Sequence, residues 1–307
     1  MADWVLTGDE VRRAVFLGTE CAPGVATALH VAGVATTRDP AGASVAITAH
    51  AEQVPATARW VHSPFMGVDA LLPGLPESVV VTRTTLGMPG RIGSYVATSV
   101  LAERWGLPSF LRQQAAGVWR AVAVPREPER RQALVVGAGL VGSGCARALR
   151  PLYDRVVGVN ASGQVRGEPV FDAVVPWDQA DGVWAASDVV VVALPLTEGT
   201  RGLFDAVALS RLVDAHLILV GRGATVDFGA LQAAMAAGQV RYASIDVLPQ
   251  EPPPANSWLW SSDRVTLTPH IAGLTHPDDI VTSFLSARQA LVEGRTPLEL
   301  VRRGQGY

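Results

Sequence analysis

Residues 133–142 read ALVVGAGLVG, and residues 143–149 continue as SGCARAL. A short apolar run is followed by glycines at Gly137, Gly139 and Gly142 and then by a stretch suited to a helix. The first glycine permits a tight turn, the second lets the backbone approach a pyrophosphate, and the third lets helix and strand pack closely. The start of the helix attracts phosphate through its free N–H groups. This strand–turn–helix context predicts a dinucleotide-binding loop, with a glycine-rich turn that binds no nucleotide as the alternative.

The same alternation of apolar runs and helical stretches extends outward from the glycine loop. Further apolar runs of strand length occur at residues 14–17, 45–47, 60–62, 79–81, 156–159, 189–194, 217–220, 242–245 and 265–267. Continuous runs of this kind are typical of parallel strands that are covered on both faces. The helical stretches between them imply right-handed crossover connections. The sequence therefore predicts an α/β fold with two doubly wound parallel-sheet units.

Length and charge exclude several classes of protein. The 307 residues correspond to about two domains. A net charge of −3 provides no basic excess for binding nucleic acid. All 25 basic residues are arginine, and the absence of lysine excludes Schiff-base chemistry and phosphate loops that need a lysine.

Cysteine content and hydropathy indicate the compartment. Cys21 and Cys145 are too few for a disulfide framework or a zinc cluster, so we expect no metal and a reducing cytoplasm. The first 17 residues lack the pattern of a signal peptide, and the apolar block at 189–196 is too short to span a membrane.

The end of the second strand of the dinucleotide motif bears on the choice of cofactor. An acidic residue there would hold the ribose 2′-hydroxyl and repel a 2′-phosphate. This chain has the neutral Asn160, followed by Ala161 and Ser162. We therefore expect NADP(H) to be favoured, with NAD(H) possible. The nearest downstream guanidinium is that of Arg166.

Three later segments carry residues suited to acid–base chemistry and anion binding. Arg222 stands between two glycines after a strand, Asp246 is followed by Glu251-Pro252, and Thr268-Pro269 precedes His270. Ligands of open α/β sheets bind at the carboxyl ends of strands, which is where these segments lie.

At these segments the chain resembles the D-isomer-specific 2-hydroxyacid dehydrogenase family. The resemblance includes the glycine loop and residues 188–201, 221–223, 246–252 and 268–270, in the family's order. Within the family the chain is similar to the glyoxylate/hydroxypyruvate reductase A branch, through Trp119, Asn160 and the closing sequence at 303–307. Two positions depart from the pattern: Ser94 replaces a usual Glu, and Ala161 replaces a frequent Arg.

The resemblance implies reduction of a small 2-keto acid, such as glyoxylate or hydroxypyruvate, to the D-2-hydroxy acid by hydride transfer from NAD(P)H. Arg222 would bind the substrate carboxylate through two charge-assisted hydrogen bonds, each worth ~1.5–3 kcal/mol. His270 would give a proton to the ketone oxygen, and Glu251 would pair with His270 and orient it. These three are the predicted catalytic residues.

The resemblance also implies the binding residues. The backbone of Met66 and Gly67, together with Arg222 and His270, would hold the substrate. Cofactor contacts are expected from Gly137, Gly139, Leu140, Val141, Gly142, Asn160, Ala161, Ser162, Leu194, Pro195, Leu196, Thr200, Val220, Gly221, Asp246, His270, Ala272 and Gly273. Among them, Asp246 would lie near the nicotinamide carboxamide.

The expected organisation is a Rossmann cofactor domain inserted in a flavodoxin-like substrate domain. The substrate domain is expected at residues 1–96 and 289–307, and the cofactor domain at 97–288. Helices near 93–105 and 278–291 would cross between the domains and act as hinges around a cleft. The resemblance further implies a homodimer formed through the cofactor domain, with no nucleic acid or membrane as partner.

Two other functions stay open from the sequence. A dehydrogenase with a larger pocket would take a larger 2-hydroxy acid, and a non-catalytic relative would bind the dinucleotide as a regulator. Structural roles are expected for the remaining histidines, which are His30, His50, His62, His216 and His276.

Overall fold

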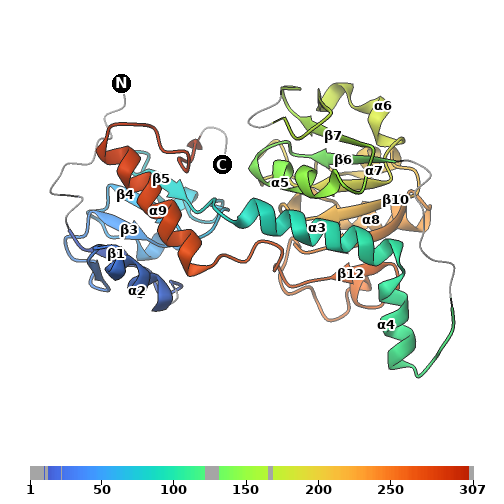
Figure 1. Ribbon diagram of the computed structural model, residues 1–307, viewed down its shortest axis with the longest axis horizontal. Coiled ribbons are helices and arrows are strands. Elements are labelled where there is room, and N and C mark those ends of the chain that lie inside the picture. Colours follow the sequence, from blue (N-terminus) through green and yellow to red (C-terminus); the bar gives the residue numbers. More distant parts are fainter. Residues whose placement is uncertain (1–9, 11–12, 22, 122–130, 165–168, 304–307) are drawn as a thin grey trace. The chain divides into compact units, whose positions relative to one another are not determined.

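The computed structural model describes residues 10, 13–21, 23–121, 131–164 and 169–303 (Figure 1). The chain divides into two units, Met1–Met88 with Thr275–Tyr307 and the inserted Pro89–Leu274. We call them the outer unit and the inserted unit. Arg166 and the closing residues 304–307 lie outside the described residues.

The described part of the outer unit forms a five-stranded parallel sheet in the order β2-β1-β3-β4-β5. This is the flavodoxin-like strand order that the sequence analysis predicts. Its strands are β1 (Val15–Leu17), β2 (Thr36–Thr37), β3 (Val45–Ile47), β4 (Trp60–Ser63) and β5 (Val80–Arg83). Its helices are α2 (Pro23–Val31) and α9 (Pro277–Val292), with 3₁₀ turns η1 (Ala51–Gln53) and η2 (Leu72–Gly74).

The last long helix completes the core of the outer unit. Phe284 of α9 stacks on Trp60 of β4, with ring centroids 4.7 Å apart and planes 4° apart. Ala287 and Leu291 continue this buried stripe one and two turns further along α9. The outer unit therefore needs residues from both ends of the chain.

The described part of the inserted unit forms a seven-stranded parallel sheet in the order β12-β11-β10-β9-β6-β7-β8. Its strands are β6 (Gln132–Val136), β7 (Arg155–Asn160), β8 (Ala173–Pro176), β9 (Val189–Val192), β10 (Ala215–Leu219), β11 (Val240–Ile245) and β12 (Val265–Leu267). Its helices are α3 (Met88–Arg104), α4 (Leu107–Ala115), α5 (Leu140–Leu149), α6 (Asp181–Trp184), α7 (Ala206–Ser210) and α8 (Phe228–Ala236), with 3₁₀ turns η3 (Trp177–Gln179), η4 (Gly223–Thr225) and η5 (Trp258–Trp260). The order is that of a Rossmann sheet with one further strand, which confirms the predicted fold class.

Strand β9 shows why the apolar runs become central parallel strands. Its four residues are all valine and all fully buried. Val190 and Val192 belong to one apolar core, and Val189 and Val191 to the core on the opposite face of the sheet. Burial of each valine contributes about 1.5–3 kcal/mol to the free energy of folding, so this sequence favours a strand that is covered on both faces.

The unit boundaries fall at 88/89 and 274/275, where the sequence analysis expected 96/97 and 288/289. Ile92, Val96 and Val100 of α3 pack into a core of the inserted unit. Phe284 and Ala287 of α9 pack into the outer unit. Each predicted hinge helix thus belongs to one unit along its buried face, and the hinge role itself stays a prediction.

Two edge strands lie outside the predicted apolar runs. β2 is two half-buried threonines, and β8 is an edge strand whose four residues are all half-buried. Edge strands bury one face less completely than central ones, so their sequences carry a weaker periodic signal.

Candidate active site

The glycine loop after β6 has the geometry that a pyrophosphate requires. Gly137 has a φ of +103°, and a Cβ there would lie 2.7 Å from the carbonyl oxygen of Ala193. A Cβ at Gly142 would overlap the carbonyl oxygen of Gly137, whereas one at Gly139 would meet nothing within 4 Å. Gly139 immediately precedes α5, and the first N–H groups of a helix have no partner within it. The loop is therefore closed on its protein side and open at Gly139, which fits a dinucleotide.

The turn after β7 is built around Asn160. Its Oδ1 accepts hydrogen bonds from the backbone N–H groups of Ser162 at 3.0 Å and Gly163 at 2.7 Å, and its Nδ2 donates to Gln164 O at 2.9 Å. Ala161 and Ser162 are exposed on this turn. The side chain thus shapes the loop without adding negative charge, so nothing at Asn160 repels a 2′-phosphate.

The segment after β9 connects the glycine loop to the strand that precedes Arg222. Its backbone at Ala193 and Leu194 lies against the positions where Gly137 and Gly221 would carry a Cβ. Thr200 Oγ1 donates to Pro195 O at 2.6 Å and accepts from Thr197 N at 2.8 Å, which closes this segment on itself. The cofactor contacts predicted for Leu194, Pro195, Leu196 and Thr200 stay predictions.

Arg222 is held by the backbone on either side of it. A Cβ at Gly221 would overlap Leu194 O, and one at Gly223 would overlap the backbone of Leu248. Thr225 Oγ1 donates to Arg222 O at 2.7 Å, and Arg222 Nη1 donates to Gly221 O at 2.9 Å. Arg222 is half-buried and follows the carboxyl end of β10. Only glycine on both sides allows this close backbone packing.

The buried carboxylate of Asp246, at the end of β11, organises the loop that follows β12. Asp246 is 2% exposed. Its Oδ1 accepts from Thr268 Oγ1 at 2.6 Å and Ile271 N at 2.9 Å, and its Oδ2 accepts from Ala272 N at 2.9 Å. The carboxylate therefore holds the backbone just after His270. Its predicted contact with the nicotinamide carboxamide stays a prediction.

His270 and Glu251 form an acid–imidazole pair. His270 Nδ1 lies 3.0 Å from Glu251 Oε2, and the two side chains are 48% and 39% exposed. Glu251 Oε1 accepts from Leu248 N at 2.9 Å, so the same carboxylate ties down its own loop. His270 has a φ of +56°, a left-handed conformation that costs a non-glycine residue about 1–3 kcal/mol. Its N–H, 2.9 Å from Asp246 O, helps to hold that conformation.

All these segments follow strands of one parallel sheet, so they lie together along the edge that is formed by the carboxyl ends of the strands. β10, β11 and β12 are adjacent, and they lead to Arg222, Asp246 and His270 respectively. The structure thus groups the site residues predicted for the inserted unit at a single sheet edge. Such an edge can orient an anion by its guanidinium and exchange a proton through its imidazole.

The predicted substrate residues Met66 and Gly67 belong to the outer unit, after the carboxyl end of β4. Both are half-buried, and Met66 O accepts from Arg83 Nη1 at 3.2 Å. Arg83 is not among the predicted site residues, because an arginine at the end of an ordinary strand carries no motif. Its contact shows that the loop of Met66 is held in place.

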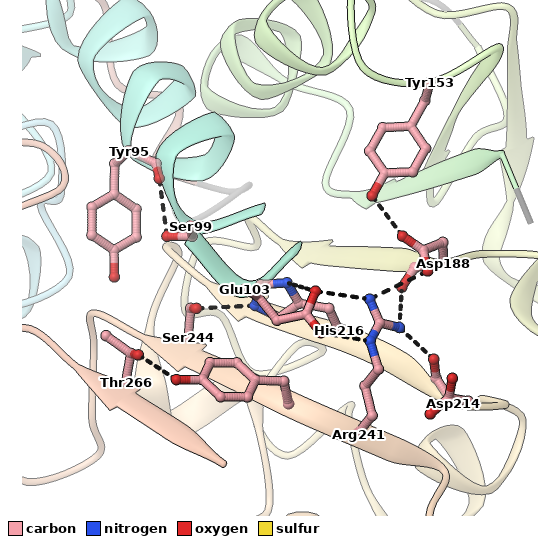
Figure 2. A network of polar contacts seen from close by, with 11 residues as sticks. Tyr95, Ser99, Glu103, Tyr153, Asp188, Asp214, His216, Arg241, Ser244 and Thr266 are labelled. Carbon is pink, nitrogen blue, oxygen red and sulfur yellow. Dashed lines mark hydrogen bonds and ion pairs between the residues drawn. The ribbon is translucent and has the colours of Figure 1, made fainter. Parts of the chain in front are cut away.

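A second polar cluster lies at the opposite edge of the inserted unit's sheet (Figure 2). Arg241 Nε pairs with Glu103 Oε1 at 2.9 Å, and Arg241 Nη2 pairs with Asp188 Oδ1 at 3.2 Å. His216 Nε2 lies 3.0 Å from Ser244 Oγ. Asp188, His216 and Ser244 are buried, Arg241 and Glu103 are half-buried, and together they connect the end of α3 to the starts of β9, β10 and β11. We assign them a structural role, as expected for His216.

Two absences bear on the kind of site. Among the described residues, no three His, Cys, Asp or Glu side chains are grouped to bind a metal ion. Within the same residues, no helix has the length and apolar character needed to cross a membrane.

The glycine loop and the acid–imidazole pair define a dinucleotide-binding α/β oxidoreductase. Residues 86–272 match the family model described as "D-isomer specific 2-hydroxyacid dehydrogenase, NAD binding domain". An uncharacterized protein in the mprR 3′ region of Streptomyces coelicolor is 42% identical over 81% of this chain and 89% of its own length. A glyoxylate/hydroxypyruvate reductase A of Yersinia enterocolitica is 31% identical over 78% of this chain and 79% of its own length.

Solved structures of the same family are similar to this chain over nearly its whole length. A D-isomer specific 2-hydroxyacid dehydrogenase from Xanthobacter autotrophicus Py2, in complex with NADPH and MES, has a TM-score of 0.83 at 29% identity and covers 96% of this chain and 99% of that one. An NADPH-dependent glyoxylate/hydroxypyruvate reductase from Sinorhizobium meliloti, in complex with NADP and sulfate, has a TM-score of 0.78 at 25% identity, with 96% and 100% covered. The chain belongs to the D-isomer specific 2-hydroxyacid dehydrogenase family, which confirms the predicted resemblance.

Proposed function

We propose that this protein reduces a small 2-keto acid, such as glyoxylate or hydroxypyruvate, to the D-2-hydroxy acid. The observation that carries the proposal is the Glu251–His270 pair, in which Glu251 on the loop after β11 lies 3.0 Å from His270 on the loop after β12. Both loops leave the carboxyl ends of strands in the sheet that also positions Arg222. Relatives named glyoxylate/hydroxypyruvate reductase A support the choice of a small acid.

Each of the three residues has one task in this reaction. Arg222 binds the substrate carboxylate, because a guanidinium forms two parallel hydrogen bonds with a carboxylate. His270 donates its proton to the ketone oxygen as negative charge develops there. Glu251 forms its hydrogen bond with Nδ1 of His270, which orients the ring and leaves Nε2 to face the substrate. The reduced nicotinamide, when bound, supplies the hydride.

NADPH is the proposed cofactor, with NADH as the alternative. The neutral turn at Asn160 supports this preference, as do the NADPH and NADP that the Xanthobacter and Sinorhizobium proteins bind. Gly139 and the start of α5 would hold the pyrophosphate. The backbone at Met66 and Gly67 is the proposed further contact for the substrate carboxylate.

Initial rates with glyoxylate and hydroxypyruvate, each with NADPH and NADH, test the proposal. We expect a higher kcat/KM with NADPH and with these acids than with phenylpyruvate. A preference for bulky keto acids would favour the dehydrogenase of a larger 2-hydroxy acid. Tight NADPH binding with no oxidation by any keto acid would favour the regulator and contradict the proposal.

A further inference from the structure

A chain of hydrogen bonds runs from helix α3 to the loop that carries His270. Tyr95 OH lies 2.8 Å from Thr268 Oγ1, and Thr268 Oγ1 donates to Asp246 Oδ1 at 2.6 Å. Asp246 in turn accepts from the backbone N–H groups of Ile271 and Ala272. The chain therefore ends on the two residues that follow His270.

The number of hydroxyl hydrogens fixes the direction of this chain. Thr268 has a single hydroxyl hydrogen, which it gives to the carboxylate of Asp246. Its oxygen must then accept from Tyr95, so the phenol is the donor. Burial raises the pKa of Tyr95, which keeps that hydrogen in place at neutral pH. Each polar atom along the chain thus has a hydrogen-bond partner. A phenylalanine at position 95 would leave the oxygen of Thr268 without its donor.

Helix α3 gives Tyr95 a fixed position. A Cβ at Gly93 would overlap Gly144 O of α5, and a Cβ at Gly144 would overlap Pro89 O of α3. The two helices therefore touch backbone to backbone next to Tyr95. Since α5 follows the glycine loop, Tyr95 connects the dinucleotide side of the inserted unit to the His270 side.

The His270 backbone needs such support, because its φ of +56° is unfavourable for a histidine. Among the described hydrogen bonds, the imidazole of His270 has one side-chain partner, which is Glu251. We propose that Tyr95 is a positioning residue for the proposed reaction, holding His270 in register through Thr268 and Asp246. The inference rests on the proposed function.

The test is Tyr95→Phe, with Tyr242→Phe as the matched control. Tyr242 OH lies 2.7 Å from Thr266 Oγ1. This is a hydroxyl pair of the same kind, but its threonine lies two residues before Thr268 and is not part of the chain of hydrogen bonds. In Tyr95→Phe, kcat should fall about 3- to 10-fold, the range of one neutral hydrogen bond, while KM and NADPH affinity change less than about twofold. Tyr242→Phe should leave kcat unchanged.

Amide hydrogen exchange supplies a readout that needs no substrate. In Tyr95→Phe the amides of Ile271 and Ala272 should exchange faster, whereas in Tyr242→Phe they should not. Thr268→Ser, which keeps the hydroxyl, should behave as wild type, and Thr268→Val should reproduce both effects of Tyr95→Phe. In Tyr95→Phe/Thr268→Val the losses should not add, because both changes cut the same chain.

Equal effects of Tyr95→Phe and Tyr242→Phe on kcat and exchange would overturn the inference, and so would an unchanged kcat in Tyr95→Phe. The two proposals fail in different ways. If the wild-type protein reduces no 2-keto acid, the proposed function is wrong and the positioning role falls with it, even where the exchange data show the chain of hydrogen bonds intact.

Discussion

Arg222 owes its placement to its neighbours more than to its own side chain. The glycines on both sides are packed against backbone, and Thr225 holds the carbonyl of Arg222. The guanidinium itself donates from Nη1 to Gly221 O, and its planar fork is pre-organised, so it loses little freedom for each hydrogen bond that it forms with a planar anion. Its contribution to catalysis should therefore depend on its shape as well as on its charge.

Replacing Arg222 tests this dependence. Arg222→Ala should cost ~3–5 kcal/mol of transition-state stabilisation, through loss of a desolvated ion pair with the substrate. Arg222→Lys keeps the charge but not the paired hydrogen bonds, so it should recover only part of kcat/KM. Steady-state kinetics measure both variants. If Arg222→Ala turned over substrate at a near-normal rate, Arg222 would not be the residue that binds the substrate carboxylate.

His270 and Glu251 should differ from Arg222 in the parameter that they change. His270→Ala should lower kcat by ~10²- to 10⁴-fold with little change in KM, because its proton is needed only as the ketone is reduced. Glu251→Gln should give a smaller decrease, since the imidazole stays but loses its charged partner. NADPH binding, followed by fluorescence, should be retained in both. His50→Gln, an exposed histidine of the outer unit, is the control.

His62 should make the outer unit sensitive to acid. Burial lowers the pKa of His62 from 6.5 to about 3. An unfolded chain takes up this proton below pH 6.5, whereas the folded chain does not, so stability is present at neutral pH and is lost as pH falls. The loss is ~1.4 kcal/mol per pH unit, or about 2 kcal/mol between pH 6.5 and 5. The free energy of unfolding, measured with urea at several pH values, should depend less on pH in His62→Gln than in wild type. His30→Gln, which changes an exposed histidine, should keep the wild-type pH dependence.

At the scale of elements, the glycine loop offers two alanine substitutions with opposite outcomes. Gly142→Ala places a methyl group against Gly137 O and should lower the thermal midpoint clearly. Gly139→Ala places it in open space, so the fold should be kept while NADPH affinity falls, because the methyl group occupies the pyrophosphate's place. Thermal unfolding and NADPH titration separate the two. Equal loss of stability in both variants would contradict this assignment.

The elements also show how far the sequence could predict the molecule. Buried central strands such as β9 and the motif-bearing turns follow from local patterns, since one run of residues contains the whole signal. The two-residue strand β2 lacks that signal, and the edge strand β8, with three apolar residues before Pro176, was not predicted. The Tyr95–Thr268 hydrogen bond joins residues 173 positions apart. Only the packing of α3 brings them together, so no local pattern could have predicted it.

At the scale of the whole molecule, α4 and the residues after it expose a set of large apolar side chains. Leu107, Leu111, Val118 and Trp119 are all exposed, with Trp119 fully so at 102%. Exposed apolar surface of this extent is typical of an interaction site. It supports the proposal that the protein is a homodimer formed through the inserted unit.

Leu111→Asp/Trp119→Asp should therefore shift the protein from dimer to monomer. Val207→Asp is the matched control, because Val207 is also exposed on the inserted unit and an acidic residue is tolerated in the first turn of α7. Sedimentation velocity measures the mass of each form. A monomeric wild type, or a dimer that survives the double substitution, would count against this surface.

The insertion of one unit within the other also governs the order in which the protein can fold on the ribosome. Residues 89–274 are one continuous stretch, so the inserted unit can complete its sheet soon after β12 emerges. The outer unit begins first and finishes last, because Trp60 waits for Phe284 of α9. A chain that terminates early, before α9 is made, would thus leave a finished nucleotide-binding body attached to an unfinished one, with the apolar side of β4 a ready target for chaperones.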